Sequence, residues 1–269
     1  MDTYIIFGGA MLAAVLITNV FFWKARKSAL QATLTGALIG LAAGVPVYLI
    51  NVLLGDMGVF LNIVLGFFSA VFVGFASFTI WFFRDPDRKI PKEKGIIVAP
   101  ADGKIKYVRE IKTGQVPVSE KNGLQAHLSE IAKTDLLEGD GFIVGIVMSI
   151  TDVHKNRSPI SGKVVLSKYT PGKFLSLKKP EGIINNERNT TVIEGDITVG
   201  VVQIASRLVR RIVSYVDSGD VIKIGDRIGM IKFSSQTDVI IPSSAKVTVS
   251  LGEQVYGGVT VIARYPPKK

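Results

Sequence analysis

The chain has 269 residues, a formal net charge of +10, two histidines and no cysteine. The lack of cysteine excludes disulfides and thiolate metal sites, and two histidines argue against a histidine-rich centre, so we expect no metal. Hydrophobic residues make up 48% of the sequence, which is high for a soluble domain of this size. They are concentrated in the first 83 residues, which points to a membrane segment.

Three uncharged apolar runs occupy this N-terminal part. The first, residues 4–23, is about as long as a helix needs to cross a bilayer. The other two, residues 33–55 and 59–83, are separated by a short turn and predict a helical hairpin that tolerates Pro46. The first three residues lack the basic character of a signal peptide. We therefore expect a retained membrane domain of three transmembrane helices in residues 1–83.

The charges around these runs predict their orientation. The connection between the second and third runs carries one charge, Asp56, whereas basic residues follow the first and third runs: Lys24, Arg26 and Lys27, then Arg84, Arg88, Lys89, Lys92 and Lys94. The positive-inside bias then places the N-terminus outside and everything after residue 83 on the cytoplasmic face of the cell membrane. The net positive charge suits an anionic leaflet. We expect no nucleic-acid partner, because no aromatic and basic recognition motif accompanies the charge.

The pattern changes after a proline-punctuated basic linker at residues 84–95. Short β runs separated by glycine follow, and together they predict one all-β domain over residues 96–269. The segment 122–137 is ambiguous and only loosely helical. Strands are predicted at 96–99, 103–109, 141–149, 162–169, 189–194, 197–204, 221–224, 227–232, 237–241, 246–250 and 260–264.

Two Gly-Asp turns, Gly219-Asp220 and Gly225-Asp226, give this domain a barrel-sandwich-like character. Such hairpins resemble the hammerheads of lipoyl and biotinyl carriers. They suggest an alternative function as a membrane-anchored carrier or adaptor module without catalysis. A carrier needs a lysine at a hairpin tip, whereas Lys232 lies within a predicted strand, which counts against this alternative.

Four segments are too polar to be assigned to the core. Asp102 follows an apolar run and precedes a glycine, and a residue in this position is also typical of a turn. His154, in SITDVHKNRSPISG, is one of two imidazoles able to act as a base near neutral pH, with a capped loop as the alternative. Residues 185–195, NNERNTTVIEG, are rich in side chains that bind anions or fix a loop. The Ser234-Ser235 pair also fits a turn or a polar strand face.

Taken together and in order, these segments resemble a known family. WFFRDPDRKIP, VAPADGKI, TDVHKNRSPISGKV, NERN and GDRIGMIKFSSQTDVIIP are similar to the short, membrane-bound form of phosphatidylserine decarboxylase, including its archaeal relatives that act on archaetidylserine. The likeness runs from about residue 81 to residue 241. It implies N-terminal transmembrane helices followed by an all-β, barrel-sandwich-like cytoplasmic catalytic domain.

The resemblance implies a proenzyme that makes its own cofactor. In the family, a serine attacks the preceding carbonyl, the ester eliminates, and hydrolysis leaves a pyruvoyl group at the new N-terminus. Ser235 matches that serine, so the chains would be residues 1–234 and 235–269. By motif match, His154 is the base and Asp102 orients its imidazole, an arrangement that suits a weak hydroxyl nucleophile.

The pyruvoyl ketone would then form a Schiff base with the substrate amine and accept electrons as carbon dioxide leaves. The implied reaction converts a serine-headed phospholipid, with ester or ether tails, to its ethanolamine form. His154 is also the expected proton donor to the α-carbon. The implied partners are an anionic phospholipid, the membrane and a second copy of the chain in a homodimer.

Two positions depart from the family pattern. Longer members have a second histidine where this chain has Arg157, which either binds the substrate's phosphate or carboxylate or forms a structural salt bridge. The family has glycine before the nucleophile, whereas this chain has Ser234. Serine gives the scissile carbonyl less freedom than glycine, although other pyruvoyl enzymes cut between two serines. Three neighbouring residues complete the predicted substrate-binding set: Glu187, Arg188 and Asn189.

Overall fold

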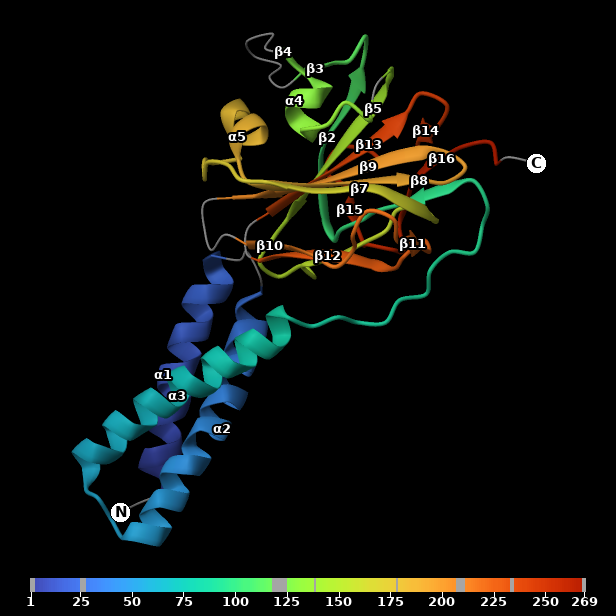
Figure 1. Cartoon of the computed structure of the whole chain (residues 1–269). Coiled ribbons are helices and arrows are strands. Elements are labelled where there is room, and N and C mark those ends of the chain that lie inside the picture. The colour runs from blue at the N-terminus through green and yellow to red at the C-terminus, as the bar shows by residue number, and fades with distance from the viewer. Residues whose placement is uncertain are drawn as a thin grey trace. The chain divides into compact units, whose positions relative to one another are not determined.

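The computed structural model describes residues 3–24, 28–117, 125–137, 139–177, 179–206, 211–232 and 235–267. The chain divides into two compact units, Met1–Arg84 and Asp85–Lys269 (Figure 1). The first unit is helical and the second is built mainly from strands, so the predicted change from apolar helices to an all-β domain is confirmed.

The first unit contains three apolar helices: α1 (Thr3–Lys24), α2 (Ala29–Leu54) and α3 (Val59–Phe82). Among the described residues, α2 and α3 are long and apolar enough to cross a membrane, while the apolar stretch of α1, Ile5–Val20, is shorter. Large side chains such as Leu53 and Phe60 are about 80% exposed (79% and 81%). An apolar surface of this kind is compatible with a lipid environment.

Small residues bring α1 and α2 into close contact. Gly36, Gly40 and Gly44 are all buried and recur every four residues along one side of α2. A Cβ atom built on Gly40 would lie only 2.2 Å from the Cα atom of Met11 in α1. In lipid, no hydrophobic effect drives helices together, so helices there pack by close backbone approach through small residues.

The α2–α3 connection is closed by a pair of asparagines. Asn51 Nδ2 donates to Asn62 Oδ1 at 2.6 Å, and Asn62 Nδ2 donates back to Asn51 Oδ1 at 3.2 Å. Asn62 is buried, so this reciprocal pairing satisfies amide groups that would be costly to leave unbonded in an apolar unit.

Replacing Gly40 with leucine should separate α1 from α2. The new side chain would meet the backbone of α1, so we expect the first unit to lose roughly 1–3 kcal/mol of stability. Helical circular dichroism during thermal unfolding in detergent measures this. Gly8→Leu is the matched control, because no heavy atom lies within 4 Å of a Cβ at that position. Equal losses in both variants would contradict this packing.

The second unit is organised around an eight-stranded sheet, with strand order β11-β7-β8-β9-β13-β5-β2-β15. Two three-stranded sheets, β1-β16-β14 and β10-β12-β6, and the β3-β4 hairpin complete it (Figure 1). The bounds are β1 Ile96–Val98, β2 Gly103–Ile111, β3 Gln115–Pro117, β4 Gln125–His127, α4 Leu128–Ala132, β5 Gly141–Met148, β6 Lys155–Arg157, β7 Gly162–Thr170, α5 Pro180–Asn185, β8 Arg188–Glu194, β9 Thr198–Ala205, β10 Arg211–Ser214, β11 Val221–Ile222, β12 Arg227–Lys232, β13 Ser235–Pro242, β14 Lys246–Val247, β15 Gln254–Val255 and β16 Val261–Arg264.

The eight-stranded sheet buries apolar side chains on both faces. Along β13, Val239 and Ile241 belong to one core cluster, and Ile240 belongs to the other. Side chains alternate between the two faces of a strand, so β13 is covered on both sides as well as paired along both edges. Strand β13 is therefore one of the enclosed central strands of this sheet.

Each of the eleven predicted strands has a counterpart in the structure, with shifted ends in all but β12. The ambiguous segment contributes a short strand, β4, and a short helix, α4, while residues 122–124 lie outside the described residues. Five strands were not predicted: β3, β4, β6, β10 and β15. In β6 the reason is physical, because Asn156 and Arg157 are buried polar residues and give no apolar alternation.

Candidate functional site

The four polar segments of the sequence lie at one end of the central strands of the eight-stranded sheet, where these strands begin or end. In the order β8-β9-β13-β5-β2, strands β8, β13 and β2 begin at this end of the sheet, and β9 and β5 finish there. Ser235 lies opposite Met148 at the end of β5 and opposite Ala205 at the end of β9. Asp102 immediately precedes β2, and Arg188 begins β8. Antiparallel pairing therefore gathers segments that are far apart in the sequence.

Ser235 is the first residue of β13, and its backbone is paired with a strand on each side. Ser234, the residue before the predicted cut, lies outside the described residues. The predicted cleavage position therefore coincides with the start of the central strand.

His154 lies between β5 and β6 and is fully buried. Its Nδ1 atom is 2.9 Å from the carbonyl oxygen of Asp152. A carbonyl only accepts, so Nδ1 carries the hydrogen, and Nε2 is then the basic nitrogen of the neutral ring. This contact favours the tautomer with the hydrogen on Nδ1, and the role of His154 as a base stays a prediction.

Asp102 is buried and bound by a residue of the predicted linker. Arg88 donates to both carboxylate oxygens, Nη1 to Oδ1 at 2.6 Å and Nη2 to Oδ2 at 2.8 Å. The backbone amide of Gly257 donates to Oδ1 at 2.8 Å. Two parallel charge-assisted bonds fix the carboxylate firmly. The orientation of His154 by Asp102 stays a prediction, whereas its pairing with Arg88 is a contact that the sequence did not indicate.

A second linker residue, Asp85, holds Arg157. Arg157 Nη2 donates to Asp85 Oδ1 at 2.9 Å and to the carbonyl of Pro86 at 3.0 Å, and Nη1 donates to the carbonyl of Gly225 at 3.1 Å. Asp85 also pairs with Arg227, the β12 residue opposite Arg157. Of the two alternatives for Arg157, the structure contains the salt bridge, and residues 85–95 of the linker belong to the second unit.

The three consecutive residues Glu187, Arg188 and Asn189 are all buried. Arg188 donates to the carbonyls of Asn186 and Ile131, and burial lowers its pKa to about 10. The backbone amide of Ile212 donates to Glu187 Oε1 at 3.4 Å. These contacts order the start of β8, and binding of substrate by the three residues stays a prediction.

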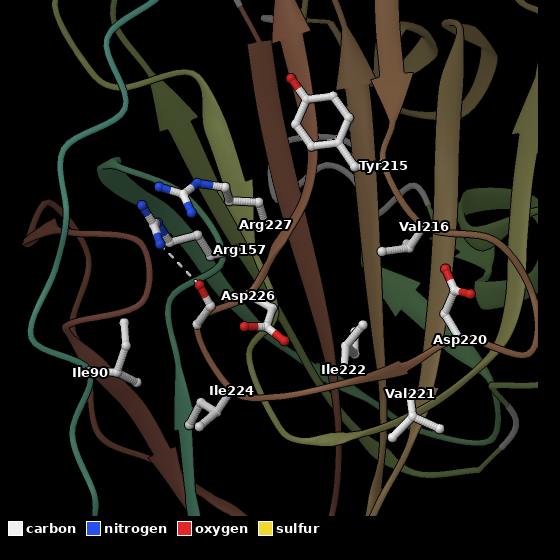
Figure 2. Close-up of a pocket in the computed structure, with 11 residues that line it drawn as sticks. Ile90, Arg157, Tyr215, Val216, Asp220, Val221, Ile222, Ile224, Asp226 and Arg227 are labelled. Atoms are coloured by element: carbon white, nitrogen blue, oxygen red, sulfur yellow. Dashed lines mark hydrogen bonds between the residues drawn. The ribbon is translucent and has the colours of Figure 1, made fainter.

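A cavity of about 520 Å³ opens beside the β6–β12 ladder (Figure 2). Arg157 and Arg227 lie next to each other on one side of it, and Tyr215 and Asp226 also contribute to its wall. Of the predicted site residues, Arg157 alone lines it among the described residues. The cavity is therefore distinct from the end of the central strands where Ser235 lies.

Two buried polar clusters flank the start of β13 and were not predicted. On one face, the hydroxyl of Thr237 accepts from Asn156 Nδ2 at 3.3 Å, and Asn156 Oδ1 accepts from Gln203 Nε2 at 2.7 Å. On the other face, Asp238 accepts from the Tyr107 hydroxyl at 2.8 Å and from Gln236 Nε2 at 2.7 Å. The signal in the sequence was SQTD at the start of an otherwise apolar strand.

Burial raises the pKa of Asp238 to about 6, and the hydrogen bonds from Tyr107 and Gln236 oppose this rise. Burial and the neighbouring carboxylate also raise the pKa of Tyr107 well above its ordinary value. The carboxylate is thus expensive to keep ionised inside the sheet.

Comparison with known proteins identifies the family. Residues 75–263 match the family model described as phosphatidylserine decarboxylase. Phosphatidylserine decarboxylase proenzymes from Symbiobacterium thermophilum and Pelodictyon phaeoclathratiforme are 38% and 42% identical to the chain over 217 and 189 residues, covering 80% and 70% of the chain and 90% and 79% of each relative. A Methanocaldococcus jannaschii protein, provisionally named archaetidylserine decarboxylase proenzyme, is 42% identical over 200 residues, 73% of the chain and 94% of the relative.

The chain belongs to the phosphatidylserine decarboxylase family. It is therefore a decarboxylase that is made as a proenzyme, and the resemblance noted in the sequence is confirmed.

Removing Arg88 should destabilise the second unit. Arg88→Ala leaves the Asp102 carboxylate buried and unpaired, so we expect a loss of about 3–5 kcal/mol in urea unfolding. Arg264→Ala breaks a half-exposed ion pair with Glu93 and should cost less than about 1 kcal/mol. Adding Asp102→Asn to an Arg88→Met variant should recover most of the stability. Failure to recover it would show that the charge pair is not the cause.

Asp238 should make stability fall with rising pH. An acid whose pKa is higher in the fold, about 6 against an ordinary 3.8, binds more protons when folded, so stability falls between about pH 4 and 6 and is level above. The change is on the order of 3 kcal/mol. Asp238→Asn should remove this slope in urea unfolding curves, whereas Asp217→Asn, at an exposed site, should retain it. An unchanged slope in Asp238→Asn would contradict the assignment.

Proposed function

We propose that this protein is a self-processing, pyruvoyl-dependent decarboxylase that converts a serine-headed phospholipid to the ethanolamine-headed lipid. The single observation that carries the proposal is the position of Ser235. Ser235 begins the central strand β13, at the same end of the sheet where β2 follows Asp102 and β8 begins with Arg188. Family membership supports the coarser part, decarboxylation by a processed chain.

Self-cleavage would start with attack of the Ser235 Oγ on the carbonyl carbon of Ser234. The Ser234–Ser235 amide bond breaks as an ester to Oγ forms. Elimination then releases residues 1–234 with a carboxylate terminus and leaves dehydroalanine at position 235. Addition of water and loss of ammonia give the pyruvoyl terminus of residues 235–269. No outside oxidant is needed, because elimination and hydration balance the step.

His154 is proposed as the base in this cleavage. Its Nδ1 contact with the Asp152 carbonyl leaves Nε2 to take the hydroxyl proton. Burial excludes competing water from the ring. Asp102, whose carboxylate pairs with Arg88, is proposed to orient the imidazole of His154.

The site suits a pyruvoyl group because its carrier residue would stay fixed after the cut. Residue 235 would lose its nitrogen as ammonia, but residues 236–240 keep their backbone pairing to both β5 and β9 and hold its carbonyl end in place. The pyruvoyl group supplies a carbonyl that condenses with the substrate amine and takes up the electrons left by departing carbon dioxide. His154 would then hold the proton that returns to the α-carbon.

The names of the relatives support a serine-headed phospholipid as the substrate. Their names specify phosphatidylserine and archaetidylserine, which share a serine phosphodiester headgroup. The apolar helices of residues 1–83 are proposed to anchor the chain, with residues 84–95 as linker and residues 96–269 as a catalytic domain on the cytoplasmic face. Arg157, Glu187, Arg188 and Asn189 are proposed to support headgroup binding by ordering the surrounding loops, and a homodimer is proposed as the assembly.

The carrier alternative gains no support from Lys232. This residue ends β12, where it is paired with Arg211 of β10, and it does not occupy a hairpin tip.

Ser235→Ala should abolish both chain cleavage and carbon dioxide release, because the hydroxyl is the nucleophile and the source of the carbonyl. Ser234→Gly should cleave faster than the parent chain, since glycine frees the scissile carbonyl. Gel mobility and carbon dioxide release from ester and ether serine lipids measure these effects. Ser244→Ala, in the turn after β13, is the control. Full activity of Ser235→Ala would refute the proposal, and the preferred lipid would identify the tail class.

A further inference from the structure

We propose that Tyr107, Gln236 and Asp238, here called the β13 network, position residue 235 for chain cleavage and for catalysis. This inference rests on the proposed function and adds positioning residues that the family motifs did not indicate. None of the three is placed in direct contact with substrate. They act through the backbone at the start of β13.

The β13 network is a closed triangle of hydrogen bonds. Gln236 Nε2 donates to the Tyr107 hydroxyl at 2.6 Å and to Asp238 Oδ1 at 2.7 Å, and the Tyr107 hydroxyl donates to Asp238 Oδ2 at 2.8 Å. Gln236 and Asp238 are fully buried, and Tyr107 is 6% exposed. The triangle thus ties two of the first four residues of β13 to β2.

Tyr107 reaches β13 by crossing the intervening strand β5 at a glycine. Gly145 lies opposite both Tyr107 and Asp238 in the sheet. A Cβ atom on Gly145 would lie 2.5 Å from the Tyr107 ring carbon Cζ. Glycine inside a strand commonly marks such a close approach. The missing side chain at position 145 is therefore what allows the hydroxyl to reach Asp238.

A β-bulge presents a second side chain to the same place. The register of β2 against β5 shifts between Ile105 and Tyr107, which makes Lys106 the extra residue. Consecutive residues of a regular strand face opposite sides, but here both Lys106 and Tyr107 contact β13 side chains. Lys106 Nζ donates to Gln236 Oε1 at 3.4 Å and to the carbonyl of Leu177 at 2.7 Å.

The charges around Asp238 come from β2 and β8, each separated from β13 by one strand. Lys106 of β2 and Arg188 of β8 both favour the ionised carboxylate, and the guanidinium of Arg109 lies 4.1 Å from the centre of the Tyr107 ring. Burying such a group costs stability unless it is bonded. The network involves the residues that follow position 235. We therefore infer that the stability spent on burying these polar groups serves to position residue 235.

Cleavage makes this support necessary. Before the cut, residue 235 is held by its peptide bond to Ser234 and by the sheet. After the cut, the sheet and the side chains of the next few residues hold it alone. A terminal carbonyl that swings away from the imidazole loses the alignment on which rate depends. The β13 network fixes residues 236 and 238, and through them the first residue of the strand.

Three variants test this positioning. Tyr107→Phe removes one hydroxyl, Asp238→Asn removes the charge, and Gly145→Ala displaces the Tyr107 ring without removing any polar group. Ile240→Val is the matched control, because Ile240 lies on the same strand and face and is buried in the apolar cluster there. The readouts are the rate of chain cleavage on gels, the kcat and KM of the cleaved enzyme, and amide hydrogen exchange at residues 236–238.

The three variants should cleave roughly ten-fold more slowly than the parent, about the effect of losing one hydrogen bond to a charged group. We expect kcat to fall with KM unchanged and exchange at residues 236–238 to quicken, while Ile240→Val stays within about two-fold. Parent-like cleavage and exchange in the variants, or equal slowing in Ile240→Val, would overturn the inference. If the parent chain itself never cleaves, the proposed function fails, and hydrogen exchange alone then decides the positioning.

Discussion

The hydrogen bonding of β13 on both edges is the constraint on which the rest of the structure depends. A chain that cuts itself must keep its new terminus in place after losing a covalent bond. An edge strand or a loop would fray at that point, because one side or both would lack backbone partners. Ser235 instead starts a strand held between β5 and β9. The proposed cut before Ser235 would therefore leave the second unit folded.

This placement costs stability. The first four positions of β13 carry polar side chains in a part of the sheet that is otherwise apolar, and Gln236, Thr237 and Asp238 are fully buried. Polar clusters on both faces of the strand satisfy them, one through Asn156 and one through Tyr107. A stretch that breaks the local apolar pattern, yet is fully bonded, is typical of a functional site. The linker also satisfies a buried polar group, because its residue Arg88 pairs with the carboxylate of Asp102.

Patterns local in the sequence predicted much of this architecture. Uncharged runs predicted three apolar helices, and apolar alternation predicted the long strands, because these signals depend on neighbouring residues. Contacts between distant residues could not be predicted in the same way. Tyr107 and Asp238 are 131 positions apart, and Arg88 meets Asp102 only after β1 folds back. The motif residues Asp102, His154 and Ser235 were found through a family resemblance, whereas the network behind them needed the fold.

Reductive trapping on residue 235 tests the central claim most directly. The purified protein would be treated with a primary amine and cyanoborohydride, digested with trypsin and analysed by mass spectrometry. Because Lys232 and Lys246 are the flanking tryptic sites, the account predicts a peptide of residues 235–246 that carries the reduced amine adduct at its first residue. An unmodified peptide of residues 233–246, with its Ser234–Ser235 bond intact, would contradict it.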